Sequence, residues 1–177
     1  MNVASLWQQG ETYAKQGQWA AALKAYDGVL EHGPKHVMAM LRGSRMALSL
    51  GRYRDSREYA VRALAARPQG DEAVLNLARA LRLFNEPELL LECVEHSRWQ
   101  ERCSAQWLTE LAMLVSTSGE NERAMQLLDV AVLRDPRHPP TRYFRGVVHM
   151  FFGQMDEAEK ELEQCIALLP TYAQAHW

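Results

Sequence analysis

The chain carries a residue period of 34. Four glycines and one asparagine mark it, at Gly17, Gly51, Asn85, Gly119 and Gly153. Prolines form a second series with the same interval, at Pro34, Pro68, Pro136 and Pro170, with one position of the series missing. A fixed period of this length is typical of a repeat array, in which each unit buries its apolar face against its neighbours. The chain is therefore expected to fold as a solenoid of stacked units.

The composition is that of a folded protein with little net charge. The 177 residues carry a formal net charge of −2, and 47% of them are hydrophobic, which argues against disorder. A charge near zero gives no bulk reason to expect nucleic acid as a partner. The N-terminus has no signal-peptide pattern, and no apolar run approaches the ~20 residues that span a bilayer. Together with three cysteines that form no CxxC pair, this predicts a cytoplasmic protein without a membrane partner.

The first unit, residues 3–36, shows how a repeat is built. Apolar residues recur at spacings of three to four along two segments, which predicts two helices packed against each other. Gly17 ends the first helix and Pro34 ends the second. We expect the small residue Gly10 where the two helices approach closely, with Tyr26 filling the space beside it.

This pattern resembles the tetratricopeptide repeat. The first unit matches that family's motif at Leu6, Gly10, Tyr13, Gly17, Trp19, Ala22, Tyr26 and Pro34. Five such units in one phase cover nearly the whole chain, at about 3–36, 37–70, 71–104, 105–138 and 139–172. The resemblance implies an all-α, right-handed α-solenoid of about five helix-turn-helix repeats. It would form a single array over residues 1–177, with residues 171–177 opening a further first helix.

Two units depart from the family pattern. In the second, Ser44 and Ser56 stand at positions where the motif has other small residues. In the third, Asn85 replaces the turn glycine and tolerates the same left-handed backbone conformation. The third unit also lacks its final proline, so we expect its second helix to end early and residues 97–104 to be irregular.

The resemblance implies that the first helix of each pair lines a concave face. The candidate peptide-binding residues on these helices are Trp7, Arg42, Arg45, Asn76, Arg79, Arg82 and Tyr143. Arg45 and Arg79 occupy the same position in adjacent repeats, and arginine binds carboxylates bidentately. This arrangement predicts a groove for an acidic protein or peptide partner. The alternative is that these arginines only favour the helix and cover apolar surface with their stems.

Some tetratricopeptide proteins bind chaperone C-termini through a clamp of lysine and asparagine side chains. The corresponding concave positions here hold Trp7, Glu11 and Arg42, followed by Glu72 and Asn76 in the third repeat. Because the clamp pattern is broken, we do not expect that activity.

The end of the chain leaves two interpretations open. Residues 171–177 would cover only part of the preceding helix, so we expect either a longer parent protein, which we favour, or a homo-oligomer formed through this open end.

The charge is distributed unevenly along the chain. Residues 37–68 contain seven arginines, whereas residues 156–163 are strongly acidic. We favour the interpretation that the acidic run is a solvated face at the start of a helix, where negative charge is stabilising. The alternative is that the basic and acidic ends of the chain associate.

Motifs for catalysis and cofactor binding do not occur in the sequence. We find no phosphate-binding loop, HExxH motif, nucleophile elbow or Rossmann glycine pattern. Cys93, His96 and Cys103 have metal-ligating side chains, but a fourth ligand for zinc is not evident, so we expect no metal. The leading hypothesis is a non-catalytic interaction module or scaffold without cofactor.

An alternative comes from similarity to bacterial proteins in which helix arrays precede transferase domains. On this interpretation the chain is the N-terminal arm of a larger bacterial enzyme, sulfotransferase-like or glycosyltransferase-like. The catalytic domain would then lie beyond Trp177.

Overall fold

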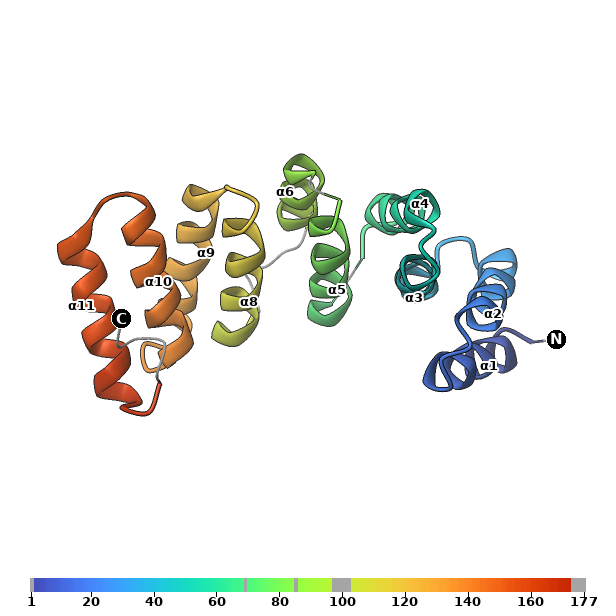
Figure 1. Ribbon diagram of the computed structural model, residues 1–177, viewed down its shortest axis with the longest axis horizontal. Helices are drawn as coiled ribbons and strands as arrows, with labels where there is room; N and C mark the ends of the chain where they lie inside the picture. The colour runs from blue at the N-terminus through green and yellow to red at the C-terminus, as the bar shows by residue number, and fades with distance from the viewer. Residues whose placement is uncertain (1, 69, 85, 97–102, 173–177) are drawn as a thin grey trace. The chain divides into compact units, whose positions relative to one another are not determined.

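Helix pairs make up the structure, a computed structural model that describes residues 2–68, 70–84, 86–96 and 103–172 (Figure 1). Within these ranges there are ten helices and no strand. Their bounds are α1 Val3–Lys15, α2 Trp19–His32, α3 Val37–Ser49, α4 Tyr53–Ala65, α5 Asp71–Arg82, α6 Pro87–His96, α8 Ala105–Ser116, α9 Asn121–Arg134, α10 Pro139–Phe151 and α11 Met155–Leu168. The predicted all-α architecture of paired helices is confirmed.

The chain divides into two compact units, residues 1–97 and 98–177. The first contains α1 to α6 and the second α8 to α11. A single array over residues 1–177 stays a prediction. The predicted irregular segment 97–104 and the further helix at 171–177 fall mostly outside the described residues.

The periodic glycines lie in the turn between the two helices of a pair, as predicted. At Gly17 the backbone has a φ of +71°, and the described members of the series at 51, 119 and 153 have φ between +70° and +90°. Residues with a Cβ atom rarely adopt this left-handed conformation, whereas glycine adopts it without steric cost. The 34-residue period therefore records the position of this turn in each repeat.

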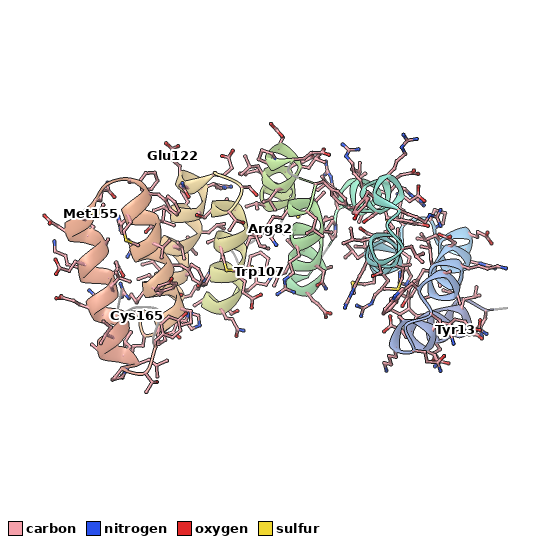
Figure 2. All side chains as sticks on the ribbon, viewed as in Figure 1. Tyr13, Arg82, Trp107, Glu122, Met155 and Cys165 are labelled. Atoms are coloured by element: carbon pink, nitrogen blue, oxygen red, sulfur yellow. The ribbon has the colours of Figure 1, made fainter. Side chains whose placement is uncertain are left out.

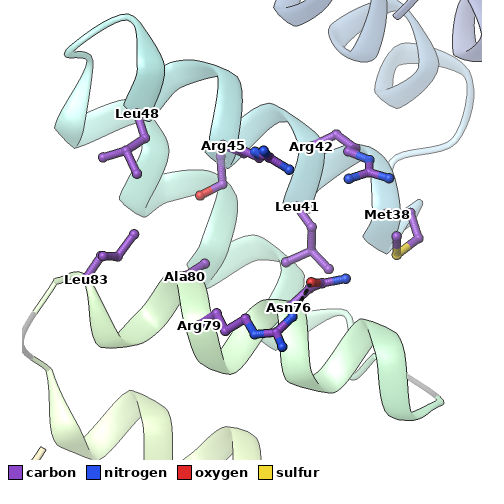
Figure 3. A pocket seen from close by; sticks show the side chains of 10 residues that line it. Met38, Leu41, Arg42, Arg45, Leu48, Asn76, Arg79, Ala80 and Leu83 are labelled. Carbon is purple, nitrogen blue, oxygen red and sulfur yellow. Dashed lines mark hydrogen bonds between the residues drawn. The ribbon is translucent and has the colours of Figure 1, made fainter. Parts of the chain in front are cut away.

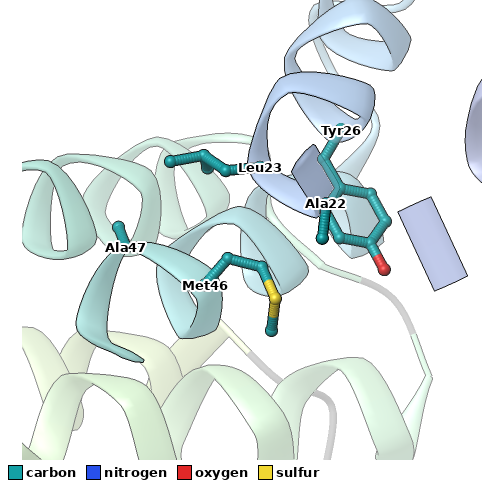
Figure 4. Packing of buried hydrophobic residues seen from close by; sticks show 5 residues of the cluster. All are labelled: Ala22, Leu23, Tyr26, Met46 and Ala47. Atoms are coloured by element: carbon teal, nitrogen blue, oxygen red, sulfur yellow. The ribbon is translucent and has the colours of Figure 1, made fainter. Parts of the chain in front are cut away.

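The core of the first unit forms where α1, α2 and α3 meet. One cluster of this core consists of Ala22, Leu23, Tyr26, Met46 and Ala47 (Figure 4). Gly10 of α1 is buried against the Tyr26 ring, and a Cβ atom added at Gly10 would lie 2.6 Å from the Tyr26 Cε1 atom. The expected close approach of the two helices at Gly10 is confirmed.

The two serines that depart from the family pattern join α3 to α4. Both are buried, with exposed fractions of 2% for Ser44 and 1% for Ser56. The hydroxyl of each donates to the backbone carbonyl of the other at 2.8 Å. Burying a hydroxyl is costly unless it is hydrogen-bonded, and this reciprocal pair satisfies both groups.

In the second unit, an ion-pair network corrects one of our predictions. We expected residues 156–163 to form a solvated acidic face, but Glu161 of α11 is only 8% exposed. Its carboxylate accepts hydrogen bonds from Arg142 at 3.0 Å and from Arg145 at 2.6 Å, both on α10. Arg145 also pairs with Asp129 of α9 at 2.9 Å. Glu161 is therefore a structural residue that ties α11 to α10.

No helix in the described ranges has both the length and the apolar character needed to cross a membrane.

Candidate functional site

A cavity of about 360 Å³ opens between α3 and α5 of the first unit (Figure 3). We call it the α3–α5 groove. Its lining residues are Met38, Leu41, Arg42, Ser44, Arg45 and Leu48 from α3, together with Asn76, Arg79, Ala80 and Leu83 from α5 and its C-terminal end. Apolar side chains form much of the wall, and arginine and asparagine side chains provide the polar groups.

Four of the seven candidate binding residues line this groove, namely Arg42, Arg45, Asn76 and Arg79. They come together because positions 42 and 76, and positions 45 and 79, are one repeat apart, so each pair occupies equivalent points on α3 and α5. Arg82 lies near the end of α5 with an exposed side chain and is not among the lining residues (Figure 2).

The other two candidates lie against aromatic neighbours. Trp7 is half-buried, with its ring centroid 5.5 Å from that of Tyr26 and 5.2 Å from that of His36. Tyr143 belongs to the second unit, where its ring lies 5.1 Å from Phe144 and 5.5 Å from Tyr172. A role for either residue in ligand binding stays a prediction.

The arginines of the groove differ in how far their charge is already neutralised. The Nε atom of Arg42 lies 3.0 Å from the Oε1 atom of Glu11 on α1. The Nη1 atom of Arg79 donates to the Oδ1 atom of Asn76 at 3.5 Å. The Arg45 side chain is exposed and forms no hydrogen bond or ion pair with any residue in the described part of the chain. Arg45 is therefore the cation best placed to meet a ligand carboxylate.

Tyr26 fixes the position of the Glu11 carboxylate. Its hydroxyl donates to the Glu11 Oε1 atom at 2.8 Å. Burial, followed by this hydrogen bond, raises the pKa of Tyr26 well above its usual value, so the hydroxyl keeps its proton. Sequence reasoning missed this link from the core through Glu11 to Arg42, because it depends on side chains from three helices.

A second cavity, of about 240 Å³, adjoins the groove on the side of α1. Arg42 and Arg45 line both cavities, and Glu11, Lys15 and Trp19 line only the second. The two arginines therefore stand between the α3–α5 groove and a cavity of mixed charge.

The second unit has a cavity at the equivalent place, between α8 and α10. It measures about 180 Å³ and is lined largely by apolar side chains. Met113 stands two repeats beyond Arg45, and Val147 stands two repeats beyond Arg79. Sequence reasoning did not predict this apolar cavity, although the 34-residue register places these residues at the groove positions.

The cysteines have the properties of core residues. Cys93, Cys103 and Cys165 are all buried, and none of them forms a disulfide within the described residues. The Cys93 thiol donates to the Val74 carbonyl at 3.8 Å, and burial raises its pKa to about 12, so it does not offer a thiolate at neutral pH. Within the described ranges, no three potential metal ligands lie close enough together to hold an ion.

Solved structures with a similar fold are repeat proteins. MamA has a TM-score of 0.72 at 17% identity, covering 99% of this chain and 96% of that chain. A MamA structure from Desulfovibrio magneticus RS-1 has a TM-score of 0.71 at 16% identity, covering 97% and 98%. YrrB, described as a TPR protein with an unusual peptide-binding site, has a TM-score of 0.69 at 17% identity, covering 98% and 90%. At these identities the likeness concerns the fold.

A curated relative is a longer protein. The tetratricopeptide repeat and J domain-containing co-chaperone DNJ1 of Fusarium oxysporum f. sp. lycopersici is 22% identical over 181 residues. The alignment covers 98% of this chain and 35% of that protein, so the chain spans about a third of the relative's length.

Sequence models of one family match most of the chain. The description of the family is tetratricopeptide repeat, and the matched residues are 8–53, 43–89 and 139–172. The matches include α3 and α5, the two helices that form the α3–α5 groove. With these matches, the periodic turn glycines and the fold in agreement, the chain belongs to the tetratricopeptide repeat family.

Proposed function

We propose that this chain is a non-catalytic protein–protein interaction module that binds an acidic segment of a partner in the α3–α5 groove. The observation that carries the proposal is the convergence of Arg45 and Arg79 on one cavity with apolar walls. Arg42 and Asn76 add polar groups beside them. Carboxylates are the groups that arginine pairs with best, because the guanidinium presents its donors in a planar fork.

The walls of the groove define a second requirement on the partner. Met38, Leu41 and Leu48 line one side, and Leu83 lines the other. At about 360 Å³ the cavity itself has room for one or two side chains of the partner. The favoured ligand is therefore a peptide with an acidic side chain next to an apolar one, bound through a few anchoring contacts.

What similar proteins are said to do supports a protein partner. YrrB is described as having a peptide-binding site, and DNJ1 as a co-chaperone. The chaperone clamp of other family members is not part of this proposal, because Trp7 and Glu11 stand where that clamp needs lysine and asparagine.

We expect charge reversal in the groove to weaken binding of an acidic peptide at least tenfold. A hydrogen bond to a charged group contributes ~1.5–3 kcal/mol, and ~1.4 kcal/mol is tenfold in affinity. The probe is a fluorescein-labelled peptide of alternating glutamate and leucine with both ends capped, titrated by anisotropy against the unaltered chain and against Arg45→Glu/Arg79→Glu. Added salt should weaken binding to the unaltered chain but not to the variant, because the variant repels the peptide and salt screens that repulsion.

The matched control for this experiment is Arg54→Glu/Arg137→Glu. Both side chains are exposed and lie outside the cavities described above, and the change in net charge is the same. A peptide in which glutamine replaces glutamate tests the need for carboxylates. Equal affinity of the groove variant and the control would overturn the proposal.

The alternative of an N-terminal arm of a transferase stays a prediction, as do the cytoplasmic location and the bacterial source. An immunoblot of source cells against this segment tests the alternative. A band near the 20.2 kDa of this chain would exclude a following catalytic domain, and a much larger band would support one.

A further inference from the structure

We propose that the α3–α5 groove of one copy holds the acidic outer stripe of α11 from a second copy. The proposal rests on the function proposed above for the groove and names one occupant for it. The stripe consists of Asp156, Glu159 and Glu163, which follow one another at intervals of three and four residues and therefore share one face of the helix.

The carboxylates of this stripe are available. All three side chains are exposed, and none of them forms an ion pair or hydrogen bond with a residue in the described ranges. Met155, at the start of the helix, is 60% exposed (Figure 2). It lies four residues before Glu159, and half-buried Ile166 lies three residues after Glu163, so helical spacing places both beside the stripe. The face thus combines acidic and apolar side chains, which is the chemistry that the groove favours.

A second acidic stripe in the chain is a weaker candidate. Glu88, Glu92 and Glu95 lie at the same spacing on α6. Glu92 and Glu95 are already engaged in interactions within the chain. Asp156, Glu159 and Glu163 have no such interaction within the described ranges, which is why we assign the groove to α11.

Charge complementarity identifies the second copy as the partner. Arg45 lies exposed in the groove without an acidic partner among the described residues, and Arg79 stands at the equivalent place on the facing helix. Glu159 and Glu163 are one helical turn apart, so their Cβ atoms lie ~6 Å apart along α11. An amphipathic helix in an apolar groove rimmed by opposite charge is a common mode of recognition.

The geometry of the association follows from the two surfaces being different. A groove in the first unit and a stripe in the second make a head-to-tail interface, which leaves one free groove and one free stripe on every complex that does not close into a ring. We therefore expect the average mass to rise with protein concentration beyond that of a dimer, or to stop at a closed ring. Because the contact is electrostatic, added salt should reverse the association.

Sedimentation equilibrium of the full chain over a concentration series at low salt tests the proposal. We expect Glu159→Arg/Glu163→Arg and Arg45→Glu/Arg79→Glu each to weaken self-association at least tenfold. An equimolar mixture of these two variants should associate again, because each then offers a surface complementary to the other. The control Glu31→Arg/Glu88→Arg makes the same charge change at exposed positions outside the stripe and should associate as the unaltered chain does.

Three outcomes would overturn the proposal. One is a monomer at every concentration, another is association that Glu159→Arg/Glu163→Arg leaves unchanged, and the third is a mixture of variants that stays dissociated. Titration of the same samples with the capped glutamate–leucine peptide separates this proposal from the proposed function. A monomer that still binds the peptide contradicts only the docking of α11, whereas a monomer that does not bind it contradicts both.

Discussion

Replacement of Glu161 by alanine is expected to lower the free energy of unfolding of the second unit by ~3–5 kcal/mol, because breaking a buried ion pair leaves the remaining charges without compensation. Glu161 accepts hydrogen bonds from both Arg142 and Arg145, whose side chains are 13% and 19% exposed. After the substitution Arg145 would keep Asp129, while Arg142 would lose the acidic partner that holds it to α11. The loss should therefore loosen the contact between α10 and α11.

Two further variants show whether the effect comes from the carboxylate. Glu161→Gln keeps the size of the side chain but removes its charge, so it should cost less than the alanine substitution. Glu163→Ala changes an exposed glutamate two residues away and should stay within ~0.5 kcal/mol of the unaltered chain. The measurements are urea unfolding followed by circular dichroism, and hydrogen exchange of peptides from α9 to α11. A Glu161→Ala chain as stable as the Glu163→Ala chain would show that the network contributes little.

The role of Glu161 was missed, although the sequence contains a signal for it. Composition groups Glu161 with the other acidic residues of 156–163, and this grouping suggested a solvated face. The 34-residue register instead aligns it with Ala25, Tyr59, Cys93 and Leu127. Three of these four residues are at most 6% exposed. A charge at an inward position of the repeat needs a partner, and register in this chain predicts burial better than local charge does.

Position in the 34-residue repeat also explains which of the candidate binding residues lie together in the groove. Positions 42, 45, 76 and 79 occupy two registers that face the groove on adjacent first helices. Trp7 and Tyr143 share a third register with Leu41, Leu75 and Thr109, which are all less than 9% exposed. Repeat spacing alone therefore predicts the groove arginines, and it places the two aromatic residues mostly in contact with the core.

Other features depend on contacts that spacing does not encode. The position of the turn glycines and the pairing of helices follow from a local pattern that recurs in each unit. The ion pair between Arg42 and Glu11 joins side chains of two neighbouring repeats. The Tyr26 hydroxyl that orients Glu11 comes from the other helix of the same repeat. Such contacts vary from repeat to repeat, so a family pattern predicts the framework but not the charge of the groove.

Replacement of Tyr26 by alanine is expected to lower the free energy of unfolding by ~3–5 kcal/mol, the usual cost of truncating a buried aromatic side chain. Tyr26 is completely buried, contacts the Trp7 ring and donates to Glu11. Gly10→Ala should also destabilise the chain, by ~1–3 kcal/mol, because its methyl group would meet a ring that has no room to move. Three Tyr26 ring atoms lie within 3.0 Å of the position of that methyl group.

The effects of the two substitutions on stability should depend on each other. Gly10→Ala should destabilise the unaltered chain but stabilise a chain that already carries Tyr26→Ala. In a Tyr26→Ala background the ring is gone, so the added methyl group meets open space and the helix gains ~0.5–1 kcal/mol from replacing glycine. A Tyr59→Ala background is the matched control, because the Tyr59 ring contacts Gly43 and is not among the atoms near Gly10. There Gly10→Ala should still destabilise. Urea unfolding of the four chains of each cycle measures the coupling. If Gly10→Ala had the same effect in both backgrounds, the glycine would be required for some reason other than the close approach of α1 to the Tyr26 ring.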